Sequence, residues 1–121
     1  MNTKQEAIIY SRVSGELDNP NVIENVLQQE NDMLKYAELN NLKVVSQFRF
    51  LNSTGDPLHQ IRLLNVLGYM QVTGIHVLLC YELSRLFRDV KHLEIIKDWL
   101  DSDKKNELRT ATRTILSSTI I

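Results

Sequence analysis

Hydrophobic residues along this chain alternate between short continuous runs and stripes that recur every three or four positions. Short apolar runs predict buried strands, and the longer stripes predict amphipathic helices. The expected strands cover Ala7 to Arg12, Lys43 to Phe50 and Ile75 to Leu83. The expected helices cover Asn21 to Asn40, Leu58 to about Gly74 and Asp89 to Leu100. Strands that alternate with helices indicate a three-layer αβα fold with a mainly parallel sheet.

Each expected helix presents one apolar stripe to the sheet. The stripes consist of Val22, Ile23, Val26, Leu27, Met33, Leu34 and Ala37, then Leu58, Ile61, Leu64, Val66, Leu67 and Met70, and finally Val90, Leu93, Ile95, Ile96 and Trp99. After this pattern the sequence is ambiguous, because 104–113 has the composition of a polar helix and 115–121 is rich in β-branched residues, which favour strands. We therefore expect a domain over residues 1–100 and a C-terminal extension of uncertain structure over 101–121.

Composition fits one soluble domain. A chain of 121 residues with 43% hydrophobic residues has enough apolar material for a single core. The only cysteine, Cys80, lies in the third apolar run, so we expect a small buried side chain, no intrachain disulfide and a reducing compartment. No apolar stretch approaches the ~20 residues of a membrane span, and the polar N-terminus is unlike a signal peptide. We expect a cytoplasmic protein with no membrane partner.

Charge is distributed unevenly along the chain. The net charge is -1, which argues against a protein that binds nucleic acid over its whole surface. Residues 1–83 carry six basic and nine acidic side chains, whereas residues 84–121 carry eight basic and six acidic ones. Any surface that faces phosphate groups is therefore expected toward the C-terminal third.

Polar groups follow each of the three expected strands, at the edge where ligands bind in parallel α/β sheets. These groups are Arg12 with Ser14, Ser53 with Thr54, and Ser84 with Arg85 and Arg88. Two arginines three positions apart on a helix share one face and can bind one phosphate together. A hydroxyl beside several arginines indicates phosphoryl-transfer chemistry.

Simpler interpretations of these residues stay open. Ser14 precedes Gly15 and could be an ordinary turn serine, and Arg85 with Arg88 could be a solvated helix face. His59 and the other two histidines show no metal-ligand spacing, and the chain has no glycine-rich phosphate loop. We therefore expect no metal and no cofactor.

Two motifs carry a resemblance to a known family. The residues Tyr10-Ser11-Arg12-Val13-Ser14 are similar to the signature Tyr, any, Arg, any, Ser that opens the catalytic domain of serine recombinases, the resolvases and invertases. The residues Leu83-Ser84-Arg85-Leu86-Phe87-Arg88 resemble a later motif of that family. Gln29 and Ser53 also fall at corresponding positions, and the resemblance covers about residues 7–100.

The resemblance implies site-specific DNA recombination through a phosphoserine intermediate. Ser14 would be the nucleophile, and Arg12, Arg85 and Arg88 would bind and neutralise the DNA phosphate. Tyr10, Gln29 and Ser53 would support the site. The partners it implies are the DNA phosphate backbone and a second copy of the chain or another recombinase.

Three positions depart from the family pattern. An acidic residue near the end of the second strand is replaced by Phe50, a loop arginine by Leu58, and the aspartate before Arg85 by Ser84. Arg62, one helical turn beyond Leu58, is our candidate for the missing arginine, and Asp56 for the lost carboxylate.

These departures favour a second hypothesis, a catalytically silent resolvase-like domain that acts as an interaction or regulatory protein. A third hypothesis is a flavodoxin-like or receiver-like module, but the chain lacks a phosphate-cradling loop and the acidic pair that a receiver needs after its first strand. The chain also ends before the long dimer-forming helix and the DNA-reading domain of typical members, so we expect a catalytic fragment or a stand-alone relative.

Overall fold

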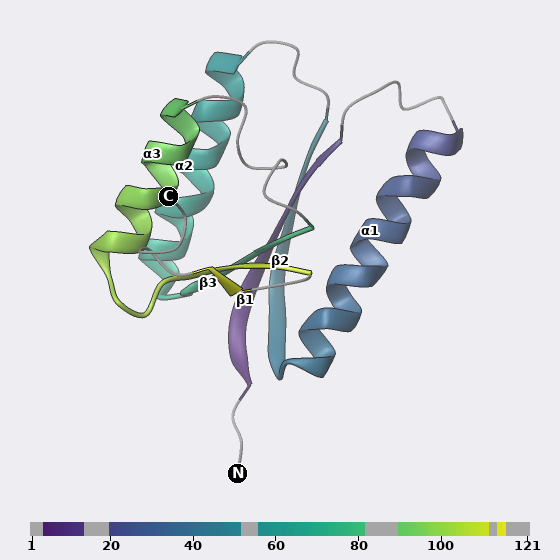
Figure 1. Ribbon diagram of the computed structural model, residues 1–121, viewed down its shortest axis with the longest axis horizontal. Helices are drawn as coiled ribbons and strands as arrows, with labels where there is room; N and C mark the ends of the chain where they lie inside the picture. Colours follow the sequence, from purple (N-terminus) through teal and green to yellow (C-terminus); the bar gives the residue numbers. More distant parts are fainter. Residues whose placement is uncertain (1–3, 14–19, 52–55, 82–89, 112–113, 116–121) are drawn as a thin grey trace.

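The computed structural model describes residues 4–13, 20–51, 56–81, 90–111 and 114–115. Within them the chain alternates strands with helices, in the order expected from the apolar pattern (Figure 1). The elements are β1 (Gln5–Val13), α1 (Pro20–Leu39), β2 (Leu42–Leu51), α2 (Asp56–Thr73), β3 (Val77–Cys80), α3 (Val90–Ser102), β4 (Glu107–Thr110) and β5 (Thr114–Ile115).

The strands form one sheet in the order β2-β1-β3-β4-β5. β1 lies between β2 and β3 and pairs in parallel with both, and β3 pairs in parallel with β4. Only β5 is antiparallel to its neighbour among the described strands. The expected fold class, an α/β fold with a mainly parallel sheet, is confirmed.

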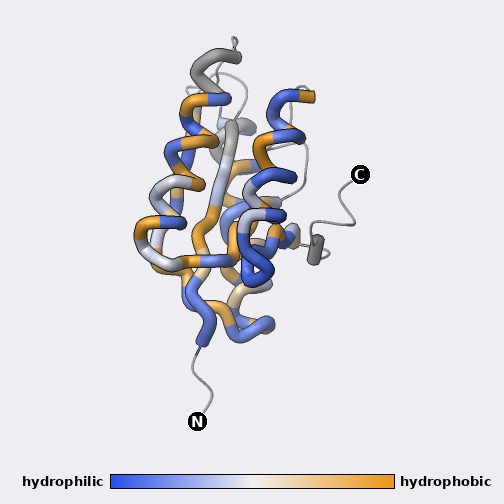
Figure 2. Tube along the Cα trace, turned by 90° about the vertical axis from the view of Figure 1, so that its left-hand side faces the viewer, coloured by the Kyte–Doolittle hydropathy of each residue, from blue (hydrophilic) through white to orange (hydrophobic). Residues whose placement is uncertain are grey.

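Helices cover both faces of the sheet, α1 on one and α2 with α3 on the other (Figure 1). Alternate residues of β1 and β3 therefore enter two separate cores. On the α2 and α3 face, Ile8, Tyr10 and Leu78 pack with helix residues such as Met70 and Ile96. On the α1 face, strand residues such as Ile9 and Leu79 pack with Met33 and Ala37 of α1. Figure 2 shows the resulting pattern, with hydrophobic strand segments enclosed between helices whose turns alternate in hydropathy.

The buried stripes of α1 and α3 are narrower than expected. Leu27 and Leu34 of α1 are 51% and 40% exposed, because α1 lies alone on its face and touches the sheet mainly through Met33 and Ala37. In α3, Ile96, Trp99 and Leu100 are buried as its period predicts, but Val90 at the first position is 68% exposed. The expectation that Leu27, Leu34 and Val90 face inward was wrong.

The buried face of α2 also differs from the expectation. Leu63, Val66 and Met70 are buried, whereas Ile61 and Leu64 are 52% and 47% exposed. This helix is apolar over most of its circumference, so spacing alone does not select a face. The sheet selects the one that carries Leu63.

The C-terminal segment contributes to the sheet. The expected alternative of a polar helix over 104–113 is wrong, because Glu107–Thr110 forms β4 beside β3. Leu108 and Thr110 are buried and alternate with Glu107 and Arg109, which are partly exposed, and this alternation is the period of a strand. Four residues give too short a pattern to stand out among the surrounding charges. Of the β-branched segment 115–121, only Ile115 lies within the described residues, in β5.

Candidate functional site

The carboxyl ends of β1, β2 and β3 lie at one edge of the sheet. Tyr10 is the register partner of both Phe48 and Cys80, and Arg12 is the partner of Phe50. The chain therefore leaves these three neighbouring strands in the same direction, which is the geometry in which parallel sheets bind ligands. We call this edge, from which the segments 14–19, 52–55 and 82–89 depart, the carboxyl edge.

Most of the expected site residues belong to those three segments. Ser14, Ser53, Ser84, Arg85 and Arg88 lie outside the described residues, so their convergence stays a prediction. The structure describes the backbone of Arg12, which lies in β1 two positions before Ser14. Parallel pairing accounts for the common edge but does not test the arrangement of the side chains.

Two expected supporting residues belong to described elements away from these segments. Tyr10 is fully buried in β1, and its ring centroid lies 5.2 Å from that of Phe50. Gln29 lies on α1, half-buried. Tyr10 therefore packs in the core on the α2 and α3 face of the sheet, and its supporting role stays a prediction.

Phe50 occupies the position at which the family pattern has an acidic residue. Its ring is packed against the core between Tyr10 and Phe48, whose ring centroid is 6.4 Å away. An aromatic ring in these contacts supplies no acid or base and accepts no proton. The structure thus explains how the position is used in this chain: it extends the core to the end of β2.

Arg62 of α2 lies over the same ring. Its guanidinium carbon is 5.3 Å from the centroid of Phe50, within the range of a cation–π contact. This contact brings a permanent positive charge to the end of β2, one helical turn along α2 from Leu58. Asp56, the candidate for the lost carboxylate, is the first residue of α2. Arg62 is therefore at the edge where the hypothesis requires it, while its role there stays a prediction.

A second arginine near this edge is held by a carboxylate, and the sequence analysis did not identify it. Arg49 of β2 donates from Nε and Nη2 to the two carboxylate oxygens of Glu30 on α1, at 2.7 and 2.5 Å. The Glu30 side chain is 9% exposed and that of Arg49 is 50% exposed. The hydrogen bond with Glu30 raises the pKa of Arg49 above its ordinary value. Glu30 and Arg49 are 19 positions apart and belong to no recognisable motif, so the sequence does not indicate that they pair.

Ser11 lies in the strand next to this pair. It is the register partner of Arg49, it is 9% exposed, and its hydroxyl has no hydrogen-bond partner among the described residues. Ser11 is thus buried in the sheet three positions before Ser14, which follows the end of β1. This difference makes Ser11 a matched control for experiments on Ser14.

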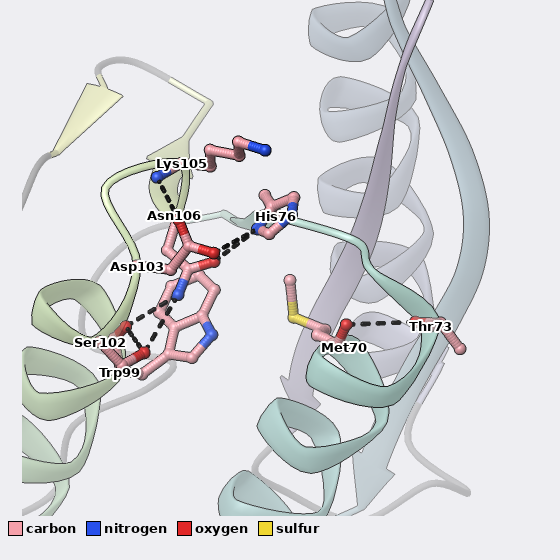
Figure 3. Close-up of polar contacts among 8 residues, drawn as sticks. All are labelled: Met70, Thr73, His76, Trp99, Ser102, Asp103, Lys105 and Asn106. Atoms are coloured by element: carbon pink, nitrogen blue, oxygen red, sulfur yellow. Dashed lines mark hydrogen bonds and ion pairs between the residues drawn. The ribbon is translucent and has the colours of Figure 1, made fainter.

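A cavity of about 160 Å³ opens at the opposite edge of the sheet, between the C-terminal ends of α2 and α3. Figure 3 shows that its polar side chains point toward one another. Asn106 donates to the carbonyl oxygen of Trp99 at 2.8 Å, and its Oδ1 is 2.9 Å from Nδ1 of His76, which also lies 3.9 Å from Asp103. These contacts connect the end of α3 with the starts of β3 and β4, which indicates a structural role.

Among the described residues, no group of three or more His, Cys, Asp or Glu side chains is placed to hold a metal ion. None of the described helices is long and apolar enough to cross a membrane.

Comparisons with known proteins agree with this geometry. The family described as "Resolvase, N terminal domain" matches residues 7–119, so the chain has the fold and sequence pattern of a recombinase catalytic domain. It belongs to the resolvase N-terminal domain family, that is, to the serine recombinases. A search of curated proteins found no match.

Solved structures of the same family share the fold. A resolvase family site-specific recombinase from Streptococcus pneumoniae matches with a TM-score of 0.68 and 20% identity, over 95% of this chain and 77% of that one. The N-terminal catalytic domain of TP901-1 integrase gives 0.66 and 22%, over 89% and 78%. The C-terminal catalytic domain of ISC1926 TnpA, an IS607-like serine recombinase, gives 0.67 and 23%, over 88% and 68%.

Proposed function

We propose that this chain is a DNA strand transferase domain whose nucleophile is Ser14. In the proposed step, the Ser14 oxygen attacks the phosphorus of a DNA phosphodiester and the bond from phosphorus to one sugar oxygen breaks. The serine proton is lost, the leaving sugar oxygen gains a proton, and the broken strand is held as a phosphoserine ester. Attack by a sugar hydroxyl reverses the step, so strands are resealed without an external energy source.

The arginines supply what a serine lacks as a nucleophile. A hydroxyl is weakly nucleophilic at its ordinary pKa, and charge accumulates on the phosphate oxygens in the transition state. Arg12, Arg85 and Arg88 are the proposed phosphate ligands, because guanidinium groups stay charged and donate in a planar fork. Arg62 is the proposed replacement for the arginine that the family has at Leu58.

The parallel pairing of β1 with β3, in a chain that belongs to this family, is the observation that carries the proposal. β1 and β3 are adjacent and parallel, so the chain reaches Ser14 and the Arg85–Arg88 motif from the same edge of the sheet. The contact of Arg62 with Phe50 adds a described positive charge at the end of β2, the third strand of that edge. The DNA contact itself is inferred from the family and from these charges.

Phe50 favours a second candidate, a catalytically silent domain that pairs with an active recombinase. The ring at this position is part of the core and cannot provide the carboxylate that the family pattern has there. Loss of one preorganised electrostatic group typically lowers a rate by ~10² to 10³-fold, although losses within one site need not add. The proposed activity is therefore expected to be slow, and the test must detect a single covalent event.

Trapping on a nicked duplex provides such a test. A cut near the nick releases a short fragment, so the phosphoserine ester accumulates and appears on a denaturing gel. Low salt and a high concentration of mixed-sequence duplexes favour binding, because phosphate contacts dominate non-specific affinity. We expect an adduct with the wild-type chain and with Ser11→Ala, and none with Ser14→Ala. Absence of an adduct under all conditions would contradict the proposal and favour the silent domain.

A further inference from the structure

The N-terminal half of α1 has few described contacts with the sheet. Of the side chains described between Asn21 and Gln29, none is buried. Glu30 is the first buried one, followed by Met33 and Ala37. Figure 1 shows the same arrangement, because α1 leans away from the strands toward its N-terminal end. Among the described side chains, Glu30 is therefore the first point from the N-terminal end at which α1 is buried against the sheet.

Arg49 fixes the orientation of the Glu30 carboxylate and holds it in a buried position. Two parallel hydrogen bonds between a guanidinium and a carboxylate define an orientation, which a single contact does not. The Glu30 side chain is also only 9% exposed, so separation from Arg49 would leave an uncompensated charge largely away from water. This distinguishes the pair from exposed ion pairs, which contribute little.

We propose that Glu30 and Arg49 form a positioning pair that sets the tilt and rotation of the N-terminal half of α1, and thereby the placement of Gln29 at the recombinase site. The inference rests on the proposed function for its consequence at the site. Gln29 is the neighbour of Glu30 on the helix and a supporting residue by the family resemblance. If Glu30 fixes the rotation of the helix, the direction of Gln29 is fixed with it. Glu30 and Arg49 are thus positioning residues, not catalytic ones.

The geometry of a helix gives the size of the effect. Side chains of a helix extend to about 5–6 Å from its axis. A rotation of α1 by only about 10° about this axis would therefore move the end of the Gln29 side chain by about 1 Å. Misplacement by ~1 Å can lower a rate by ~10²-fold where reacting groups must be aligned. A small movement at the pair is therefore sufficient to impair the site.

Amide hydrogen exchange tests the effect on the helix without reference to activity. In Glu30→Gln and Arg49→Met we expect the amides of Glu24 to Gln29, which have helical hydrogen-bond partners, to exchange at least about fivefold faster. The amides of Met33 to Leu39 should change much less. An equal acceleration in both halves would overturn the proposal, since it would indicate a general loss of stability.

The ion pair of Glu107 and Arg109 on β4 is the matched control. It is also a close contact, with Arg109 Nη2 2.7 Å from Glu107 Oε2, and Arg109 also interacts with Tyr36 in the C-terminal half of α1. Glu107→Gln should therefore leave the exchange of Glu24 to Gln29, in the N-terminal half of α1, unchanged. A similar acceleration in this variant would also contradict the proposal.

The trapping assay then tests the consequence for the site. We expect the rate of adduct formation on Ser14 to fall by about tenfold or more in Glu30→Gln, and to recover partly in Glu30→Asp, which keeps the charge. An adduct rate equal to the wild type, despite faster exchange in the N-terminal half of α1, would overturn the positioning role. Failure of the wild-type chain to form any adduct would instead refute the proposed function, and the exchange result would still decide whether the pair sets the helix.

Discussion

The guanidinium of Arg62 lies over the ring of Phe50, 5.3 Å from guanidinium carbon to ring centroid. Phe50 stands where the family pattern has an acidic residue, and Arg62 is our candidate for the arginine that the family has at Leu58. The aromatic ring at the end of β2 contacts Arg62 and so helps to hold a positive charge at this edge. The two departures from the family pattern therefore lie in direct contact with each other.

Arg62→Ala is expected to reduce covalent trapping strongly and stability weakly. Loss of one phosphate-binding arginine should lower the adduct rate by ~10²-fold or more. Loss of a cation–π contact at a partly exposed site should lower the free energy of unfolding by only about 1 kcal/mol. Trapping kinetics and urea denaturation measure the two effects. Lys43→Ala, which removes an exposed charge from the start of β2, is the control and should trap normally. Unchanged trapping in Arg62→Ala would remove Arg62 from the site.

Anion binding is expected even if catalysis is slow. Three arginines around Ser14 would attract phosphate or sulfate whatever the later chemistry. Titration followed by NMR should show saturable shifts in the wild-type chain and clearly weaker binding in Arg85→Ala. Lys104→Ala, which removes an exposed charge after α3, should bind as the wild type does. Negligible affinity in both the wild type and Arg85→Ala would count against a phosphate site.

The parallel core should dominate stability. Leu78 of β3 is fully buried between β1 and β4, so Leu78→Ala is expected to lower the free energy of unfolding by ~2–5 kcal/mol. Val72, 87% exposed on α2, is the control, and Val72→Ala should change stability by no more than about 0.5 kcal/mol. Denaturant unfolding measures both. A small effect at Leu78 would be inconsistent with the central position of β3.

Asn106 should connect β4 to the rest of the fold. Asn106→Ala removes its bonds to the Trp99 carbonyl and to His76, and the buried partners left without it should cost about 1–3 kcal/mol of stability. Lys105→Ala next to it removes an exposed side chain and should be nearly neutral. Equal stability of the two variants would show that the contacts in Figure 3 contribute little.

The sequence predicted the parts of the fold that follow from strong apolar patterns. The apolar runs around Ile8 and Leu78 are buried on both faces of the sheet. Continuous apolar runs of this kind predict interior strands from the sequence alone. The face of α2 was not predictable, because Leu63 and Leu64 are equally apolar and only packing on the sheet distinguishes them. β4 escaped prediction because one buried leucine, Leu108, stands among charged residues.

The site was predictable only as far as its motifs reach. Tyr10 and Arg62 were identified by motif and spacing, and the structure describes where both lie. The pair of Glu30 and Arg49 could not be found, since it arises from the packing of α1 on β2 and matches no motif. Contacts of this kind depend on tertiary geometry that periodicity does not contain.

The central claim is tested most directly by locating the DNA adduct within the chain. Trypsin cleaves after Arg12 and Lys35, and the peptide between them contains Ser14 as its only hydroxyl-bearing residue, whereas Tyr10 and Ser11 fall in the preceding peptide. After trapping and nuclease digestion, mass spectrometry should find the residual nucleotide on the peptide of residues 13–35. A nucleotide on the preceding peptide, or DNA that binds through Arg85 but forms no adduct at all, would contradict the assignment of Ser14 as the nucleophile.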